Sequence, residues 1–109
     1  MGSSQALNQI RGFDRFMVRL KRRYAPSKVL LFGSRARAEH LATSDVDLLI
    51  VSDAFEGIPW RLRLQLVVKM WDGDVALEPL CYTETEFQRR SKEISIIREA
   101  ARTGVALRI

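Results

Sequence analysis

The sequence predicts an α/β (α+β) fold, in which a small mixed sheet of about four strands is flanked by helices. Short apolar runs of strand length alternate with longer segments whose apolar residues recur every three or four positions. Turn-forming residues separate these segments, as at Pro26, Gly33 and Asp72-Gly73. The length of 109 residues suits a single domain spanning residues 1–109, and 47% of the residues are hydrophobic and available for its core.

The first half of the chain predicts a helix, a strand, a single helical turn and a second strand: residues 5–24, 28–32, 34–39 and 45–52. The first helix has apolar residues at helical spacing and stops before Pro26, which cannot continue it. The first strand, KVLLF, is wholly apolar after its lysine, and Gly33 interrupts it.

The second half predicts a helix, a strand, another helix and an edge strand: residues 59–71, 74–81, 84–102 and 105–109. Pro59 suits the first turn of a helix, where its missing N–H is not needed. Thr83 and Glu86 have the spacing of a capping box at the start of the last helix. Gly104 fits the end of that helix.

The composition narrows the possible classes of protein. A formal charge of +5, from 18 Lys and Arg against 13 Asp and Glu, suits an anionic partner such as a nucleotide. Cys81 is the single cysteine, so an internal disulfide is excluded. Neither a transmembrane stretch nor the apolar core of a signal peptide is found, and we expect a cytoplasmic protein without membrane contact.

Two carboxylates stand at the start of the second predicted strand. Asp45 and Asp47 are two positions apart, so they project from the same face of a strand, while Val46 and its alternate neighbours face the core. Carboxylates this close repel each other, and a divalent cation relieves the repulsion. Mg²⁺ favours a few carboxylate oxygens and leaves coordination positions for phosphate oxygens and water.

Gly33 and Ser34 follow the first predicted strand directly. Glycine allows a positive φ and a close approach of a ligand to the backbone. If Ser34 starts a helical turn, its hydroxyl and the free N–H groups can hold a phosphate. Arg35 and Arg37 add positive charge beside that position. The pattern predicts a triphosphate-binding turn next to a metal-binding pair.

A third carboxylate would complete a two-metal site, and it must come from a neighbouring strand. In the segment DVALEPL, Asp74 and Glu78 share one face of the predicted strand. Periodicity alone leaves both residues as candidates.

The stretch FGSRARAEHLATSDVDLLIV resembles the signature of the DNA polymerase beta nucleotidyltransferase superfamily, and in particular its minimal nucleotidyltransferases. Ala38 stands where the family commonly has glycine. The segment EPLCYTETEF is similar to the family's third strand and last helix. On that alignment Glu78 takes the place of the third metal carboxylate, which is commonly Asp, and Asp74 is the fallback. The resemblance covers residues 8–109.

The resemblance implies transfer of a nucleoside monophosphate, such as AMP from ATP, to a hydroxyl, with release of pyrophosphate. It implies that Asp45, Asp47 and Glu78 hold two Mg²⁺ ions, which Mn²⁺ could replace. Gly33, Ser34, Arg35 and Arg37 would then contact the nucleotide. Ser44 would do the same, or would orient the loop before Asp45.

The acceptor is not encoded in any motif of the chain. Minimal members of the family resemble antitoxins that act with a helical HEPN-type partner, and others pair with copies of themselves; both are open here. A second hypothesis is a catalytically weak antitoxin that acts by forming a complex, which Glu78 in place of Asp favours. A third is a plain nucleic-acid-binding protein, but no motif supports it and clustered carboxylates would repel a phosphate backbone.

Overall fold

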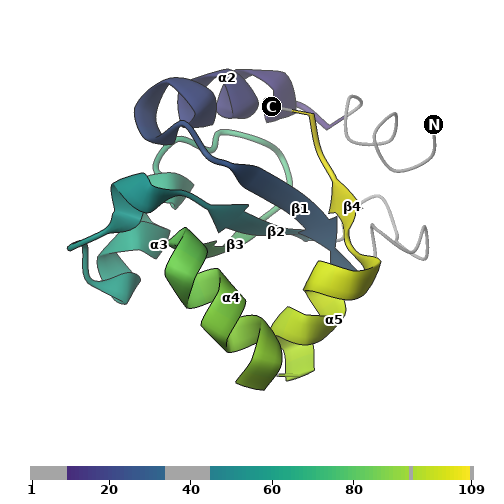
Figure 1. The fold of residues 1–109 in the computed structure, drawn as a ribbon. Helices are drawn as coiled ribbons and strands as arrows, with labels where there is room; N and C mark the ends of the chain where they lie inside the picture. Colours follow the sequence, from purple (N-terminus) through teal and green to yellow (C-terminus); the bar gives the residue numbers. More distant parts are fainter. Residues whose placement is uncertain (1–9, 34–44, 94, 109) are drawn as a thin grey trace.

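Four strands form one sheet in the order β3-β2-β1-β4 in a computed structural model, which describes residues 10–33, 45–93 and 95–108 (Figure 1). The strands are β1 (Lys28–Phe32), β2 (Val46–Val51), β3 (Leu77–Tyr82) and β4 (Val105–Ala106). β1 is antiparallel to both of its neighbours, whereas β2 and β3 are parallel. The sheet is therefore mixed, and the α+β fold predicted from the sequence is confirmed.

The β2–β3 pair aligns the ends of two strands that are far apart in the sequence. A parallel pair needs a crossover connection, which here contains the short 3₁₀ helix η2 (Asp53–Phe55) and α3 (Trp60–Val68). β3 is an edge strand, and an edge position tolerates Pro79 because one side of the strand needs no ladder hydrogen bond. In this register Asp47 lies opposite Glu78.

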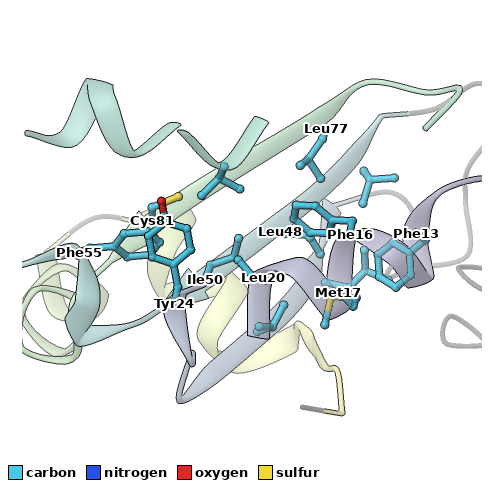
Figure 2. Close-up of a cluster of buried hydrophobic side chains, with 14 residues drawn as sticks. Phe13, Phe16, Met17, Leu20, Tyr24, Leu48, Ile50, Phe55, Leu77 and Cys81 are labelled. Carbon is cyan, nitrogen blue, oxygen red and sulfur yellow. The ribbon is translucent and has the colours of Figure 1, made fainter. Parts of the chain in front are cut away.

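One face of the sheet is covered by α2 (Phe13–Tyr24). Its apolar residues recur at helical spacing and pack against Val46, Leu48 and Ile50, the alternate residues of β2 predicted to face the core (Figure 2). The buried residues that α2 contributes are Phe13, Phe16, Met17, Leu20 and Tyr24. The predicted start of this helix is wrong in the part that is described, because residues 10–12 form a turn and Gly12 adopts a φ of 85°.

The opposite face of the sheet is covered by α4 (Glu84–Glu93) and α5 (Ser95–Thr103) (Figure 1). Leu49 and Val51 of β2 are buried there together with Phe87 and Ile97. β2 is therefore buried on both faces, which explains its nearly unbroken apolar sequence. The single helix predicted over 84–102 is wrong: two helices are described, one on each side of residue 94.

The segment between α3 and β3 differs from its prediction at both ends. α3 ends at Val68 rather than near Trp71, whose indole N–H donates to the carbonyl of Val75 at 2.7 Å. The Trp71 ring packs edge-on against Phe16 at 5.5 Å between centroids. β3 begins at Leu77, not at residue 74, because residues 72–76 form an irregular connection between α3 and β3.

Arg63 fixes the position of α3, and sequence analysis missed it. Its side chain is 6% exposed and forms a bidentate pair with Glu86 of α4, at 2.6 and 3.1 Å. It also donates to the carbonyls of Ile58 and Cys81, at 2.8 and 3.2 Å. Glu86 forms the predicted capping box with Thr83, since each side chain accepts from the backbone N–H of the other residue.

Within the described ranges, every helix falls short of the length or apolar character that a membrane span requires.

Candidate active site

Two carboxylates from adjacent parallel strands meet at one end of the β2–β3 pair. Asp47 is the second residue of β2, and Glu78 is the second residue of β3. The two positions are direct neighbours in the sheet, and the side chains share a hydrogen bond. Partial burial, this hydrogen bond and the charges of Glu78 and Asp45 raise the pKa of Asp47 to about 6. Asp47 therefore retains its proton to a higher pH than an ordinary aspartate does.

The bend after β1 lies directly against this pair. Gly33 follows Phe32, which is opposite Asp47 in the β1–β2 register, and it adopts a φ of 76°. A Cβ atom at Gly33 would collide with Oδ2 of Asp47 and would be 3.2 Å from its Cγ. Only glycine permits both this backbone conformation and this approach. The backbone of the bend therefore borders the carboxylate without an intervening side chain.

Asp45 precedes the first residue of β2 and is exposed. Its charge contributes to the raised pKa of Asp47, so the two carboxylates lie within electrostatic range of each other. In the part of the chain that the structure describes, no three His, Cys, Asp or Glu side chains lie close enough together to hold a metal ion. Asp47 and Glu78 thus form a close pair, with Asp45 at its border.

Asp74 is not brought to this site. It precedes β3 in a turn, and its side chain is 69% exposed. Its carboxylate faces Arg11 at 3.9 Å. The prediction that residue 74 lies in the third strand is wrong because the chain reaches the sheet three residues later. Of the two candidates for a third carboxylate, Glu78 is the one next to Asp47.

Four residues predicted to contact a nucleotide lie outside the described residues: Ser34, Arg35, Arg37 and Ser44. Of the residues predicted to contact a nucleotide, Gly33 is the one that the structure describes.

A pocket of about 490 Å³ opens beside the carboxylate pair, between the sheet and α3. Apart from Asp47 and Glu78, the described residues of its lining are apolar: Phe32, Trp60, Leu64, Val68, Leu77, Pro79 and Leu80. Trp60 is 45% exposed and lies 6.5 Å from the ring of Tyr82. Sequence analysis did not assign this residue to the site. Its position directly after Pro59, at the start of a helix, was the available signal.

The chemistry of the pair suits a hard divalent cation. The negative charge of Glu78 raises the pKa of Asp47, and a divalent cation bound between the two carboxylates would relieve their repulsion. The pocket beside the pair leaves room for a further ligand. The Asp47–Glu78 pair therefore fits a divalent cation, and the charge of Asp45 lies within electrostatic range of it.

The comparisons with known proteins agree with this geometry. The sequence matches the family model of the nucleotidyltransferase domain over residues 14–103, most of the chain. The protein therefore belongs to the nucleotidyltransferase domain family, and its fold is that of a minimal nucleotidyltransferase of the DNA polymerase beta superfamily. The comparison with curated proteins yields no match.

Solved structures share the fold. A proposed nucleotidyltransferase from Sulfolobus solfataricus superposes with a TM-score of 0.61 at 22% identity, over 82% of this chain and 80% of that one. The BolA domain of SufE1 and BolA1, both from Arabidopsis thaliana, have TM-scores of 0.53 and 0.54 at 23% and 22% identity. Each of these alignments covers 67% of this chain and 92% of the other. At such identities the likeness concerns the fold alone.

Proposed function

We propose that the protein transfers a nucleoside monophosphate from a nucleoside triphosphate to an acceptor hydroxyl at the Asp47–Glu78 pair. The observation that carries the proposal is the contact between the Gly33 bend and Asp47, whose side chain is hydrogen-bonded to Glu78 on the neighbouring strand. Membership of the nucleotidyltransferase domain family supports it independently.

In this proposal Asp45, Asp47 and Glu78 would hold Mg²⁺, with two ions expected from the family resemblance, and Mn²⁺ could replace it. The bound cation would offset the charge of the phosphates and favour ionisation of the acceptor hydroxyl. The backbone of Gly33 lets the phosphates approach, with Ser34, Arg35, Arg37 and Ser44 as further contacts. The acceptor oxygen bonds to the α-phosphorus as the bond to pyrophosphate breaks. The hydroxyl proton passes to Glu78 or to water.

The finer form of the proposal names ATP as donor and a HEPN-type partner as acceptor, with this chain as the antitoxin of a toxin–antitoxin pair. It rests on the resemblance of the FGSRARAEHLATSDVDLLIV segment to minimal nucleotidyltransferases. The apolar pocket beside the carboxylates is compatible with a protein acceptor, because the described residues of its lining include no basic side chain that would bind a nucleic acid backbone.

A catalytically weak antitoxin that acts by complex formation is the second candidate. Glu78 is one methylene longer than the usual Asp, and no group of three metal-binding side chains is formed within the described residues. In this case the same surface would bind the partner without transferring a nucleotide.

Label transfer from α-labelled ATP separates the two candidates. The protein is incubated with Mg²⁺ and a helical candidate partner, and label on the partner is measured. If the protein is a transferase, we expect the partner to be labelled by wild type and by the matched control Asp74→Asn. We expect no labelling by Asp47→Asn or Glu78→Gln. Partner binding that persists in all four proteins without any labelling would instead identify the binding module.

A further inference from the structure

A second surface, separate from the carboxylate pair, lies along the outer side of α2. Two hollows of about 460 and 310 Å³ adjoin each other there, since both are lined by Arg19 and Arg22. None of their lining residues belongs to the pocket beside Asp47 and Glu78. We define the arginine groove by the residues around these hollows, which include one acidic residue: Asp14, Arg15, Val18, Arg19, Arg22, Arg23, Tyr24, Leu66 and Met70.

The rim of the groove is cationic and partly fixed in place. Arg19 donates to the carbonyl of Met70 at 2.9 Å, which joins α2 to the segment after α3. Asp72 lies between Arg15 and Arg19, at 3.3 and 4.0 Å, and offsets part of their charge. Arg22 and Arg23 are both exposed on the last turn of α2. Guanidinium groups suit carboxylates because they offer planar, bidentate donors.

The floor of the groove is apolar, and this limits what can occupy it. Leu66 and Met70 line the larger hollow, and Val18, which is 46% exposed, lines the smaller one. A nucleic acid would leave this apolar floor unused. Tyr24 is only 5% exposed, so its ring is not available to stack on a base.

An amphipathic helix with acidic flanks matches both parts of the groove. Its apolar stripe would cover the floor, and its carboxylates would reach the arginine rim. α2 has 12 residues and is about 18 Å long, which accommodates about three turns of a second helix. A second copy of this chain fits poorly, since α4 mixes its glutamates with Arg89, Arg90 and Lys92 and its Glu86 is already paired with Arg63.

We propose that the arginine groove is a docking site for an acidic amphipathic helix of a partner protein. This proposal is independent of nucleotide transfer, because the groove shares no residue with the carboxylate pair or its pocket.

The test uses fluorescence anisotropy with a labelled synthetic helix that carries leucines on one face and glutamates on both flanks. We expect the wild-type protein to bind it, and to bind a matched peptide with lysines in place of the glutamates at least about tenfold more weakly. The double variant Arg22→Gln/Arg23→Gln should weaken binding of the acidic peptide by about tenfold, a typical loss for central arginines of an interface. Val18→Ser should weaken it as well, because it removes apolar surface from the floor without changing the charge of the groove.

Arg89→Gln on α4 is the matched control, since it removes an exposed arginine elsewhere and should leave the affinity unchanged. Equal binding of the two peptides, or full binding by the double variant, would overturn the proposal. So would an RNA or DNA oligonucleotide that binds through Arg22 and Arg23 while the acidic peptide does not. Self-association in sedimentation velocity that the double variant removes would assign the groove to a second copy instead.

Discussion

At the scale of the residue, Gly33 and Asp47 constrain each other. The positive φ of Gly33 turns its backbone toward the Asp47 carboxylate, and the missing side chain leaves room for that carboxylate to reach Glu78. The sequence alone predicted that a glycine bend and a carboxylate would be neighbours. It could not predict the contact itself, because the contact depends on the register that places Phe32 opposite Asp47.

Gly33→Ala should cost about 2 kcal/mol of unfolding free energy, from left-handed strain and from displacement of Asp47. Gly57→Ala is the matched control: Gly57 has a φ of 81°, but a Cβ there meets nothing within 4 Å. It should cost only about 1 kcal/mol. Urea denaturation of both variants measures the difference. Equal costs would mean that the Gly33–Asp47 contact contributes nothing to the fold.

The raised pKa of Asp47 predicts a pH-dependent gain of stability on its removal. Its folded-state pKa of about 6 lies above the ordinary value of 3.8, so the native state retains a proton that the unfolded chain releases. Stability from this group is therefore present at low pH and lost as the pH rises through about 4 to 6.

The variant Asp47→Asn has no carboxyl group that ionises at this position, so it does not lose this stability as the pH rises. At pH 8 the variant should be more stable than wild type by on the order of 1 kcal/mol. This figure is reduced because solvent screens the charge of a partly buried group. At pH 3.5 the gain in stability should vanish. Chemical denaturation at the two pH values provides the measurement, with Asp74→Asn as an exposed control that should show no such gain. A variant that is less stable than wild type at pH 8 would contradict the assigned electrostatics.

At the scale of the element, the Arg63–Glu86 pair connects α3, β3 and α4. Pro59 predicted where α3 begins, and the capping box predicted where α4 begins. An arginine in a helix that is rich in arginine and leucine gave no sign that it would be buried. That outcome depends on Glu86 and on the carbonyls of Ile58 and Cys81, which long-range packing brings together.

Arg63→Ala should destabilise the protein by about 2–3 kcal/mol at pH 7, because it leaves a partly buried carboxylate and two carbonyls without their donor. The exposed pair Arg102–Glu99, at 2.7 Å, provides the control, and Arg102→Ala should change stability by less than about 0.5 kcal/mol. Thermal denaturation of both variants is the measurement. Similar small losses in the two variants would show that the buried pair is no stronger than a surface pair.

The Arg63–Glu86 pair also predicts that the stability of the protein decreases in acid. The hydrogen bond from Arg63 lowers the pKa of Glu86 from its ordinary 4.5 to about 2. A lowered folded-state pKa gives stability that is present above pH 4.5 and is lost as the pH falls toward 2. The stability difference between wild type and Arg63→Ala should therefore narrow over that interval. A difference that stays constant from pH 6 to pH 2 would contradict this assignment.

At the scale of the whole molecule, the fold class followed from the alternation of apolar runs, but the strand order did not. The sequence indicated four strands without stating that β2 pairs in parallel with β3 and antiparallel with β1. This order places Gly33, Asp47 and Glu78 in neighbouring positions across three strands. Asp74 showed the limit of periodicity: it has the same alternation as Glu78 but lies before the strand begins.

The central claim is that Asp45, Asp47 and Glu78 act together as a metal and nucleotide site. Electron paramagnetic resonance of Mn²⁺, titrated into the protein with a non-hydrolysable ATP analogue, tests it most directly. We expect bound Mn²⁺ in wild type and in Asp74→Asn, and at least about tenfold weaker binding in Asp45→Asn, Asp47→Asn and Glu78→Gln. Equal Mn²⁺ binding in all five proteins, or a loss confined to Asp74→Asn, would contradict the account.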